Sequence, residues 1–135
     1  MKLLGLDVGD TRIGLAVAEK GRPIAFGRGW ITRSSEASDT SAILELANAE
    51  NAEIVVVGLP IETSGKEGSQ AIKVRRFAQN LRRAGLKVEF FDERFTTRLA
   101  KQRLTHLSRK KRQEKGRLDE AAAIAILEGY LERNQ

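Results

Sequence analysis

Three carboxylates stand where this sequence otherwise turns apolar side chains inward, and they are the residues best able to do chemistry. Asp7 lies inside the first apolar run, Glu93 follows the last one, and Asp119 opens the final helical segment. A charge in such a position needs a partner, and a divalent cation would serve all three. The chain has no cysteine and one histidine, His106, so oxygen ligands remain and favour Mg²⁺ or Mn²⁺ over zinc.

The chemistry that such a site performs on phosphate esters is two-metal hydrolysis. One ion activates a water and the other stabilises the leaving oxygen. Three converging acids would also repel one another and raise at least one pKa unless a cation neutralised them. The alternative is that each acid is structural: Asp7 pairs near the Gly9-Asp10 turn, Glu93 is an ordinary charge at a strand exit, and Asp119 is a first-turn acid favoured by the helix dipole.

The helical phase of Asp119 favours the convergent arrangement. At 3.6 residues per turn it shares one stripe with Ala122, Ala123, Ile126 and Tyr130, which is the apolar side of the segment. The run of alanines at 121–123 allows this helix to approach a sheet closely. The pattern therefore predicts that Asp119 points toward the sheet, near Asp7 and Glu93.

The net charge of +6 comes from one segment. Residues 94–117 hold ten Lys or Arg and one acid, a charge of +9, so the other residues sum to 6 − 9 = −3. A localised basic stretch is typical of proteins that bind a phosphate backbone. The candidate contacts in it include Arg98, Lys101, Arg109, Lys110, Lys111 and Arg112. The alternative is a solvated basic helix face without a partner.

The hydrophobic pattern predicts the elements that position these residues. Strands are expected at 2–8, 12–18, 24–32, 54–57 and 87–92, and helices at about 39–51, 69–83, 96–107 and 118–133. In the second helix Ile72, Phe77 and Leu81 are expected to face inward. Three antiparallel strands, then helix, strand, helix, strand and two helices, give an α/β fold: a mixed five-stranded sheet with helices on both faces, the two later strands parallel to the first and beside it. This is the plan of the ribonuclease H-like fold, in one domain covering residues 1–135.

Four sequence blocks resemble the YqgF (RuvX) family of ribonuclease H-like nucleases. They are LDVGDTRIGLAV at 6–17, VVGLP at 56–60, DERFTT at 92–97 and LDEAAAIAILEGYL at 118–131. The resemblance implies that Asp7, Glu93 and Asp119 are the catalytic, metal-binding acids. It also implies that four further residues surround the site and contact nucleic acid: Arg12, Arg94, Thr96 and Thr97. The chain departs from the family at Glu62, where an Asn-containing loop is usual, so Glu62 is an auxiliary candidate that positions a water.

The family is associated with two substrates. One is precursor 16S ribosomal RNA, trimmed at its 5′ end in ribosome biogenesis, for which a monomer suffices. The other is the Holliday junction of DNA recombination, which requires a homodimer because two symmetric strands are cut. We expect the RNA, with the junction as the alternative. With few aromatic residues, of which Phe77, Phe90 and Phe91 are assigned to the core, recognition should favour backbone shape.

Two other classes of function compete with a nuclease. The segment GLDVGDTRIG also resembles the phosphate hairpin of actin-like and sugar kinases, but 135 residues cannot supply the second nucleotide-binding half. A non-catalytic nucleic-acid-binding module would keep the basic segment but leave the inward phase of Asp119 unexplained. No apolar run approaches the roughly 20 residues of a membrane span, and the absence of cysteine fits a reducing compartment, so a cytoplasmic protein without a membrane partner is expected.

Overall fold

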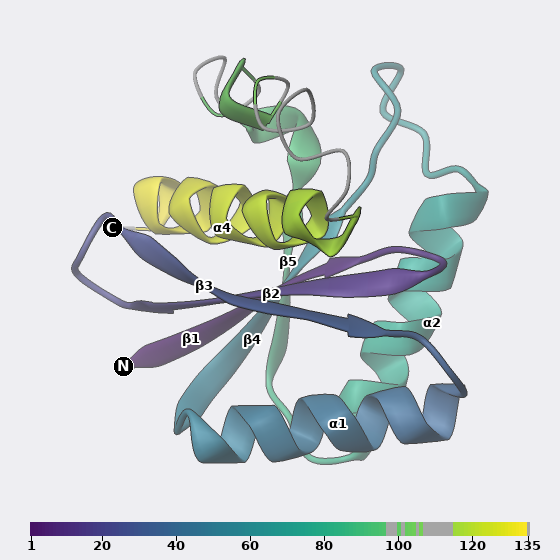
Figure 1. The fold of residues 1–135 in the computed structure, drawn as a ribbon. Coiled ribbons are helices and arrows are strands. Elements are labelled where there is room, and N and C mark those ends of the chain that lie inside the picture. Colours follow the sequence, from purple (N-terminus) through teal and green to yellow (C-terminus); the bar gives the residue numbers. More distant parts are fainter. Residues whose placement is uncertain (97–99, 101, 105, 107–114, 135) are drawn as a thin grey trace.

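A mixed five-stranded sheet forms the central layer of the molecule (Figure 1). The computed structural model describes residues 1–96, 100, 102–104, 106 and 115–134. Its strands are β1 (Lys2–Val8), β2 (Arg12–Glu19), β3 (Ala25–Thr32), β4 (Ala52–Leu59) and β5 (Val88–Asp92). The predicted mixed α/β fold is confirmed.

The order of strands across the sheet is β3-β2-β1-β4-β5. The first three strands pair antiparallel, β4 pairs parallel with β1, and β5 pairs parallel with β4. Both later strands were expected beside β1, but only β4 is its neighbour. Each crossover carries the chain one strand further from β1, so β5 lies at the edge.

Alternation along β1 divides the core into two layers. Leu4, Leu6 and Val8 belong to the cluster under α1 (Glu36–Ala49) and α2 (Ser69–Arg83). Leu3 belongs to the cluster under α4 (Lys115–Arg133), on the opposite face. Because successive side chains of a strand point to opposite faces, Asp7 shares its face with Leu3 and faces the side of α4.

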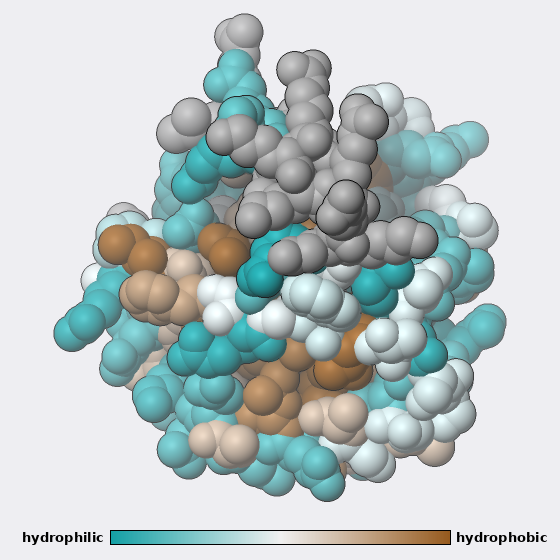
Figure 2. All heavy atoms as spheres, in the orientation of Figure 1, coloured by the Kyte–Doolittle hydropathy of each residue, from teal (hydrophilic) through white to brown (hydrophobic). Residues whose placement is uncertain are grey.

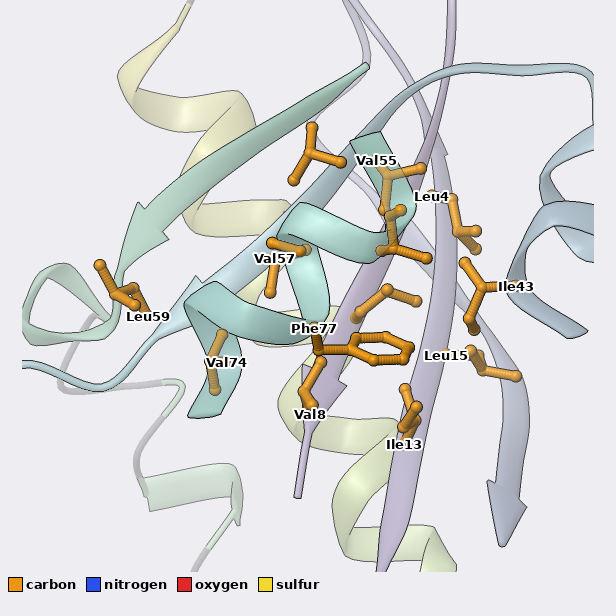
Figure 3. Packing of buried hydrophobic residues seen from close by; sticks show 14 of the residues in the cluster. Leu4, Val8, Ile13, Leu15, Ile43, Val55, Val57, Leu59, Val74 and Phe77 are labelled. Atoms are coloured by element: carbon orange, nitrogen blue, oxygen red, sulfur yellow. The ribbon is translucent and has the colours of Figure 1, made fainter. Parts of the chain in front are cut away.

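The two helices of the first layer follow from local sequence. Helix α1 begins at Glu36, three residues before the predicted start, because the Ser35 side chain accepts a hydrogen bond from the Ser38 N–H and caps the helix. Helix α2 has the predicted bounds, and its Phe77 packs among strand residues (Figure 3). The expectation that Ile72 faces inward is wrong: the residue is 54% exposed, and Val74 and Ala78 complete the buried stripe.

Helix α4 also begins earlier than predicted, at Lys115 instead of Leu118. Asp119 therefore lies beyond the first turn, where the stabilising effect of the helix dipole on an acid has largely fallen off. The chain enters this region through a short 3₁₀ turn, η1 (Glu93–Phe95), that ends at Thr96 in an extended conformation. Of the helix expected at 96–107, the described residues 100, 102–104 and 106 are helical.

Edge strand β3 exposes apolar residues on one side of the molecule. Phe26 is 60% exposed, and hydrophobic residues reach the surface between the strands and α1 (Figure 2).

Among the described residues, no helix combines the length and the apolar character that crossing a membrane requires.

Candidate active site

The candidate acids are placed by the ends of the parallel strands. Asp7 is the last residue but one of β1, and Glu93 directly follows β5, at the start of η1. Strands β1, β4 and β5 run parallel, so they end at the same edge of the sheet. Ligand sites of open α/β sheets commonly occupy this edge.

Two glycines allow the other partners to come close to Asp7. Gly14 lies opposite Asp7 in the β1–β2 register, and a Cβ atom at Gly14 would overlap the carbonyl group of Asp119. The backbone of α4 thus lies directly on the sheet beside Asp7. On the other side, a Cβ atom added to Gly58 of β4 would lie 3.2 Å from the carboxyl carbon of Glu93. Small residues on neighbouring strands therefore give both acids access to the sheet surface around Asp7.

The carboxylate of Asp7 carries the clearest electrostatic signature of the site. Burial, followed by the charges of Glu93 and Asp119, raises the pKa of Asp7 from 3.8 to about 7. Within the described part of the chain no hydrogen bond or ion pair reaches this carboxylate. Proximity of like charges in a partly buried place disfavours ionisation, as predicted for three converging acids.

Glu93 and its neighbour Asp92 have opposite electrostatic environments. Burial, and next the charge of Asp92, raises the pKa of Glu93. The pKa of Asp92 is lowered, chiefly by hydrogen bonds from the Arg94 side chain, whose Nη2 lies 2.7 Å from Asp92 Oδ2. Arg94, expected to contact phosphate, is thus held by Asp92 at the rim of the site and is exposed.

Asp119 has a cationic partner within the protein. The Nε of Arg12 donates a 2.8 Å hydrogen bond to Asp119 Oδ2, and the two side chains are 26% and 21% exposed. Arg12 begins β2 and Asp119 lies on α4, so the pair joins sheet to helix. It brings the Arg12 guanidinium, a donor suited to phosphate oxygens, to the acids.

The donor atoms of the site fit a hard divalent cation, but the acids do not form a closed site around one. The three candidate ligands offer only carboxylate oxygens, the donors that Mg²⁺ and Mn²⁺ prefer. Yet among the described residues no three acidic or histidine side chains are already gathered closely enough to hold an ion. Charges act on a pKa over longer distances than ligands coordinate, so the acids are near enough to repel one another without forming a closed cage. One oxygen of Asp119 is also engaged by Arg12.

The remaining predicted residues fall into two groups. Glu62 is exposed in the loop after β4, where its backbone N–H bonds to the Lys66 carbonyl, and its carboxylate lies close to Gly68. That loop reaches the rim, because a Cβ atom on Gly65 would lie 3.8 Å from the Arg94 guanidinium. The other candidates lie outside the described residues: Thr97, Arg98, Lys101, Arg109, Lys110, Lys111 and Arg112.

Neither the role of the glycines nor the partner of Arg12 was among the predictions from sequence. Gly14 and Gly58 carry no chemistry, but they decide how near the acids come to Asp7. A signal was present, since Gly14 lies in the strand that returns from Asp7 and Gly58 ends the apolar run 54–57. The ion pair between Arg12 and Asp119 had no such signal, because it joins residues 107 positions apart.

Comparison with known proteins gives consistent relatives along the whole chain. A sequence model of the RuvX family, described as Holliday junction resolvase, matches residues 1–133. A protein of Thermus thermophilus, whose name proposes a pre-16S rRNA nuclease, is 48% identical over 133 residues, covering 98% of both chains. A protein of Anaeromyxobacter sp. with the same name is 42% identical over 134 residues, again covering 98% of both chains.

Solved structures show the same fold at low sequence identity. RuvC of T. thermophilus, solved in complex with a Holliday junction substrate, matches with a TM-score of 0.59 and 19% identity, covering 96% of this chain and 92% of the other. The Holliday junction resolvase of fowlpox virus matches with a TM-score of 0.61 and 11% identity, covering 100% of both chains. These likenesses show that the chain has the ribonuclease H-like fold.

Proposed function

The chain belongs to the RuvX family, and we propose that it is a divalent-metal-dependent nuclease that hydrolyses phosphodiester bonds in structured nucleic acid. Its substrate in this proposal is precursor 16S ribosomal RNA, trimmed at the 5′ end in the cytoplasm. The names of the relatives from Thermus thermophilus and Anaeromyxobacter support this choice. The observation that carries the proposal is Asp7, a carboxylate coupled electrostatically to Glu93 and Asp119 at the end of the parallel strands.

In this proposal Asp7, Glu93 and Asp119 would hold two metal ions, either Mg²⁺ or Mn²⁺. When bound, the metal supplies Lewis acidity that activates water and stabilises charge on the leaving oxygen. Asp7 would be a ligand with a fixed backbone, because it lies within β1 and pairs with Gly14 of β2. Glu93 approaches from the 3₁₀ turn and Asp119 from α4, so the acids come from three separate elements.

Arg12 has two roles in the proposal. In the free protein it neutralises Asp119, which limits repulsion among the three acids. When nucleic acid arrives, its guanidinium is close enough to the acids to transfer hydrogen bonds to a phosphate oxygen beside them, because guanidinium binds both anions in similar geometry. Arg94 and Thr96 complete the rim in this arrangement, with Glu62 as an auxiliary acid on the loop after β4.

A second candidate function is resolution of four-way DNA junctions. The description of the family model and the likeness to the RuvC and fowlpox resolvases favour it. This activity would require two copies of the chain, one for each strand that is cut. The same acids would serve either substrate, so only the nucleic acid and the oligomeric state distinguish the two functions.

The test is a side-by-side cleavage assay. A 5′-extended precursor 16S fragment and a four-way junction are each incubated with wild type and with Asp7→Asn, with Mg²⁺ or Mn²⁺ and without. We expect metal-dependent cleavage of the RNA by wild type alone, and a mass measurement in solution assigns the active species. Cleavage of the junction alone by a dimer would select the second candidate. Metal-independent binding without cleavage of either substrate would overturn both and indicate a non-catalytic binding module.

A further inference from the structure

The two helices that share one face of the sheet carry opposite charge. Helix α2 contains five Lys or Arg residues and no Asp or Glu. Helix α1, in contact with the same hydrophobic cluster, contains three Asp or Glu residues and no Lys or Arg. The basic segment predicted from sequence, residues 94–117, does not include α2. Asp39 of α1 is buried and paired with Arg33, so the exposed acids Glu36 and Glu45 form the anionic side of this layer and α2 forms the cationic side.

Some basic residues of α2 pack against the rest of the protein, and the others make little or no contact with it. Arg75 pairs with Glu67, at 2.7 Å from Nη2 to Oε2, and its guanidinium lies 4.9 Å from the Phe90 ring centroid. Arg82 donates to the Val88 carbonyl at 2.9 Å and also lies over Phe90. Both therefore serve the packing of α2 against β5.

The arginine that directly follows each of these two residues points away from the sheet. Arg76 and Arg83 lie on the side of α2 opposite the buried stripe, and both are exposed. In the described part of the chain neither has an ion pair or a side-chain hydrogen bond. Lys73 lies on the flank of this side and makes one exposed contact of 3.4 Å with Asp10, of the kind that contributes little to stability. We call Lys73, Arg76 and Arg83 the α2 basic face.

The α2 basic face begins beside the candidate active site. Gln70 donates to the carbonyl of Val8, at the end of the strand that carries Asp7. The Lys73–Asp10 contact joins α2 to the turn between β1 and β2, which connects Asp7 to Arg12. From Lys73 to Arg83 the helix advances about 15 Å, at 1.5 Å per residue. That length matches roughly four nucleotides of a stacked strand at 3.4 Å each.

We infer that the α2 basic face is a second binding surface for the nucleic-acid backbone, which holds an arm of the substrate extending from the site along α2. The inference rests on the proposed function, because it takes the substrate to be a polyanion. The exposed acids of α1, Glu36 and Glu45, repel the backbone from the neighbouring surface and so favour an arm that follows α2. The occupant is a phosphate backbone, read without base contacts, since the face offers cations and no exposed aromatic ring.

The test compares two charge-matched double variants. Arg76→Gln with Arg83→Gln removes two cations from the face. Lys20→Gln with Arg22→Gln removes two exposed cations from the turn between β2 and β3, where the Lys20 N–H bonds to the Met1 carbonyl at the opposite end of β1 from Asp7. Binding of a 5′-extended RNA hairpin is measured by fluorescence anisotropy over a series of salt concentrations, without divalent ions so that the RNA stays intact.

The α2 variant should bind more weakly, and its slope of log affinity against log salt should fall by about 1.4 for single-stranded contacts or about 1.8 for duplex contacts. The control pair should leave the slope unchanged, and Arg76→Lys with Arg83→Lys should restore it. Equal slopes for wild type and the α2 variant, or an equal change in the control, would overturn the inference.

The binding experiment on the α2 basic face can fail or succeed independently of the test for nuclease activity. A reduced slope in a protein that cleaves no substrate would support the α2 basic face and overturn the nuclease. An unchanged slope with normal metal-dependent cleavage would do the reverse. Shortening the RNA until no arm reaches α2 should abolish the difference between the variant and wild type; persistence of the difference would contradict a contact with the arm.

Discussion

Arg12 Nε lies 2.8 Å from Asp119 Oδ2, so the first residue of β2 holds an acid of α4 across 107 positions of sequence. The guanidinium is an internal cation among three acids. In the proposed function it would compete with a metal ion for Asp119 and, once displaced, would donate to a phosphate oxygen. The pair is partly buried, which makes it less sensitive to salt than an exposed pair.

Replacing Arg12 should therefore strengthen metal binding while weakening substrate binding. We expect Arg12→Gln to lower the Kd for Mn²⁺ by about threefold to tenfold, in line with loss of a nearby cation, and to raise the Kd for RNA. Isothermal titration with Mn²⁺ measures the first effect. Arg28→Gln is the matched control, since Arg28 makes a 2.8 Å pair with Glu50. Unchanged or weaker Mn²⁺ binding in Arg12→Gln would contradict competition for Asp119.

Neutralising Asp119 should separate catalysis from binding. Asp119→Asn keeps the shape of the side chain but removes a proposed ligand charge, so the cleavage rate should fall at least about a hundredfold. Nucleic-acid affinity should change by less than about threefold, because the basic residues remain. Asp10→Asn serves as a control: its side chain is 66% exposed at the adjacent turn, and cleavage should persist. Comparable loss in both variants would point to a general electrostatic effect.

Asp7 should make the stability of the metal-free protein depend on pH. Its pKa is about 7 in the folded chain, above the ordinary value of 3.8, so the folded state binds the proton more tightly. The stabilisation is complete below the unfolded pKa and is lost as the pH rises toward about 7. The difference in unfolding free energy between wild type and Asp7→Asn should shift against wild type by up to about 4 kcal/mol between pH 4 and 8, since each pKa unit corresponds to about 1.4 kcal/mol. Urea denaturation in EDTA measures it, and parallel pH profiles would contradict an elevated pKa.

Gly14 should tolerate no side chain. A Cβ there would overlap the Asp119 carbonyl, so Gly14→Ala must push α4 away from the sheet and should destabilise the protein by about 3 kcal/mol. Gly21→Ala is the comparison, because nothing lies within 4 Å of its Cβ position and only the positive φ of 97° is strained. Its loss should be about 1 kcal/mol. Equal losses in thermal unfolding would show that the close approach is unimportant.

The basic run 110–112 lies outside the described residues, and its role stays a prediction from sequence. Neutralising Lys110, Lys111 and Arg112 together should weaken RNA binding and reduce the salt slope by about 2 to 3 if each contacts a phosphate. The effect should add to that of the α2 basic face, since the two sets lie in different segments of the chain. An unchanged salt slope would show that this run does not contact phosphate.

The sequence alone determined the periodic features of this protein. Alternation in residues 2–8 placed Asp7 on one face of a strand, and the 3.6-residue period put Asp119 on the same stripe as Ile126 and Tyr130, which are buried. Helical periodicity also predicted the bounds of α2 correctly, but it predicted the wrong orientation for Ile72. These features are local, because side-chain direction in a strand or helix follows from position along a few residues.

Tertiary structure decided which distant groups meet. The contact of Gly14 with the α4 backbone, the coupling of Asp7 to Glu93 and the pairing of Arg12 with Asp119 all depend on how crossovers bring separate elements to one edge of the sheet. The same is true of α2, where adjacent arginines differ because only Arg75 and Arg82 lie against β5. Periodicity gives the face on which a residue lies, but the charges it meets there come from other segments of the chain, and only the packed fold brings them within range.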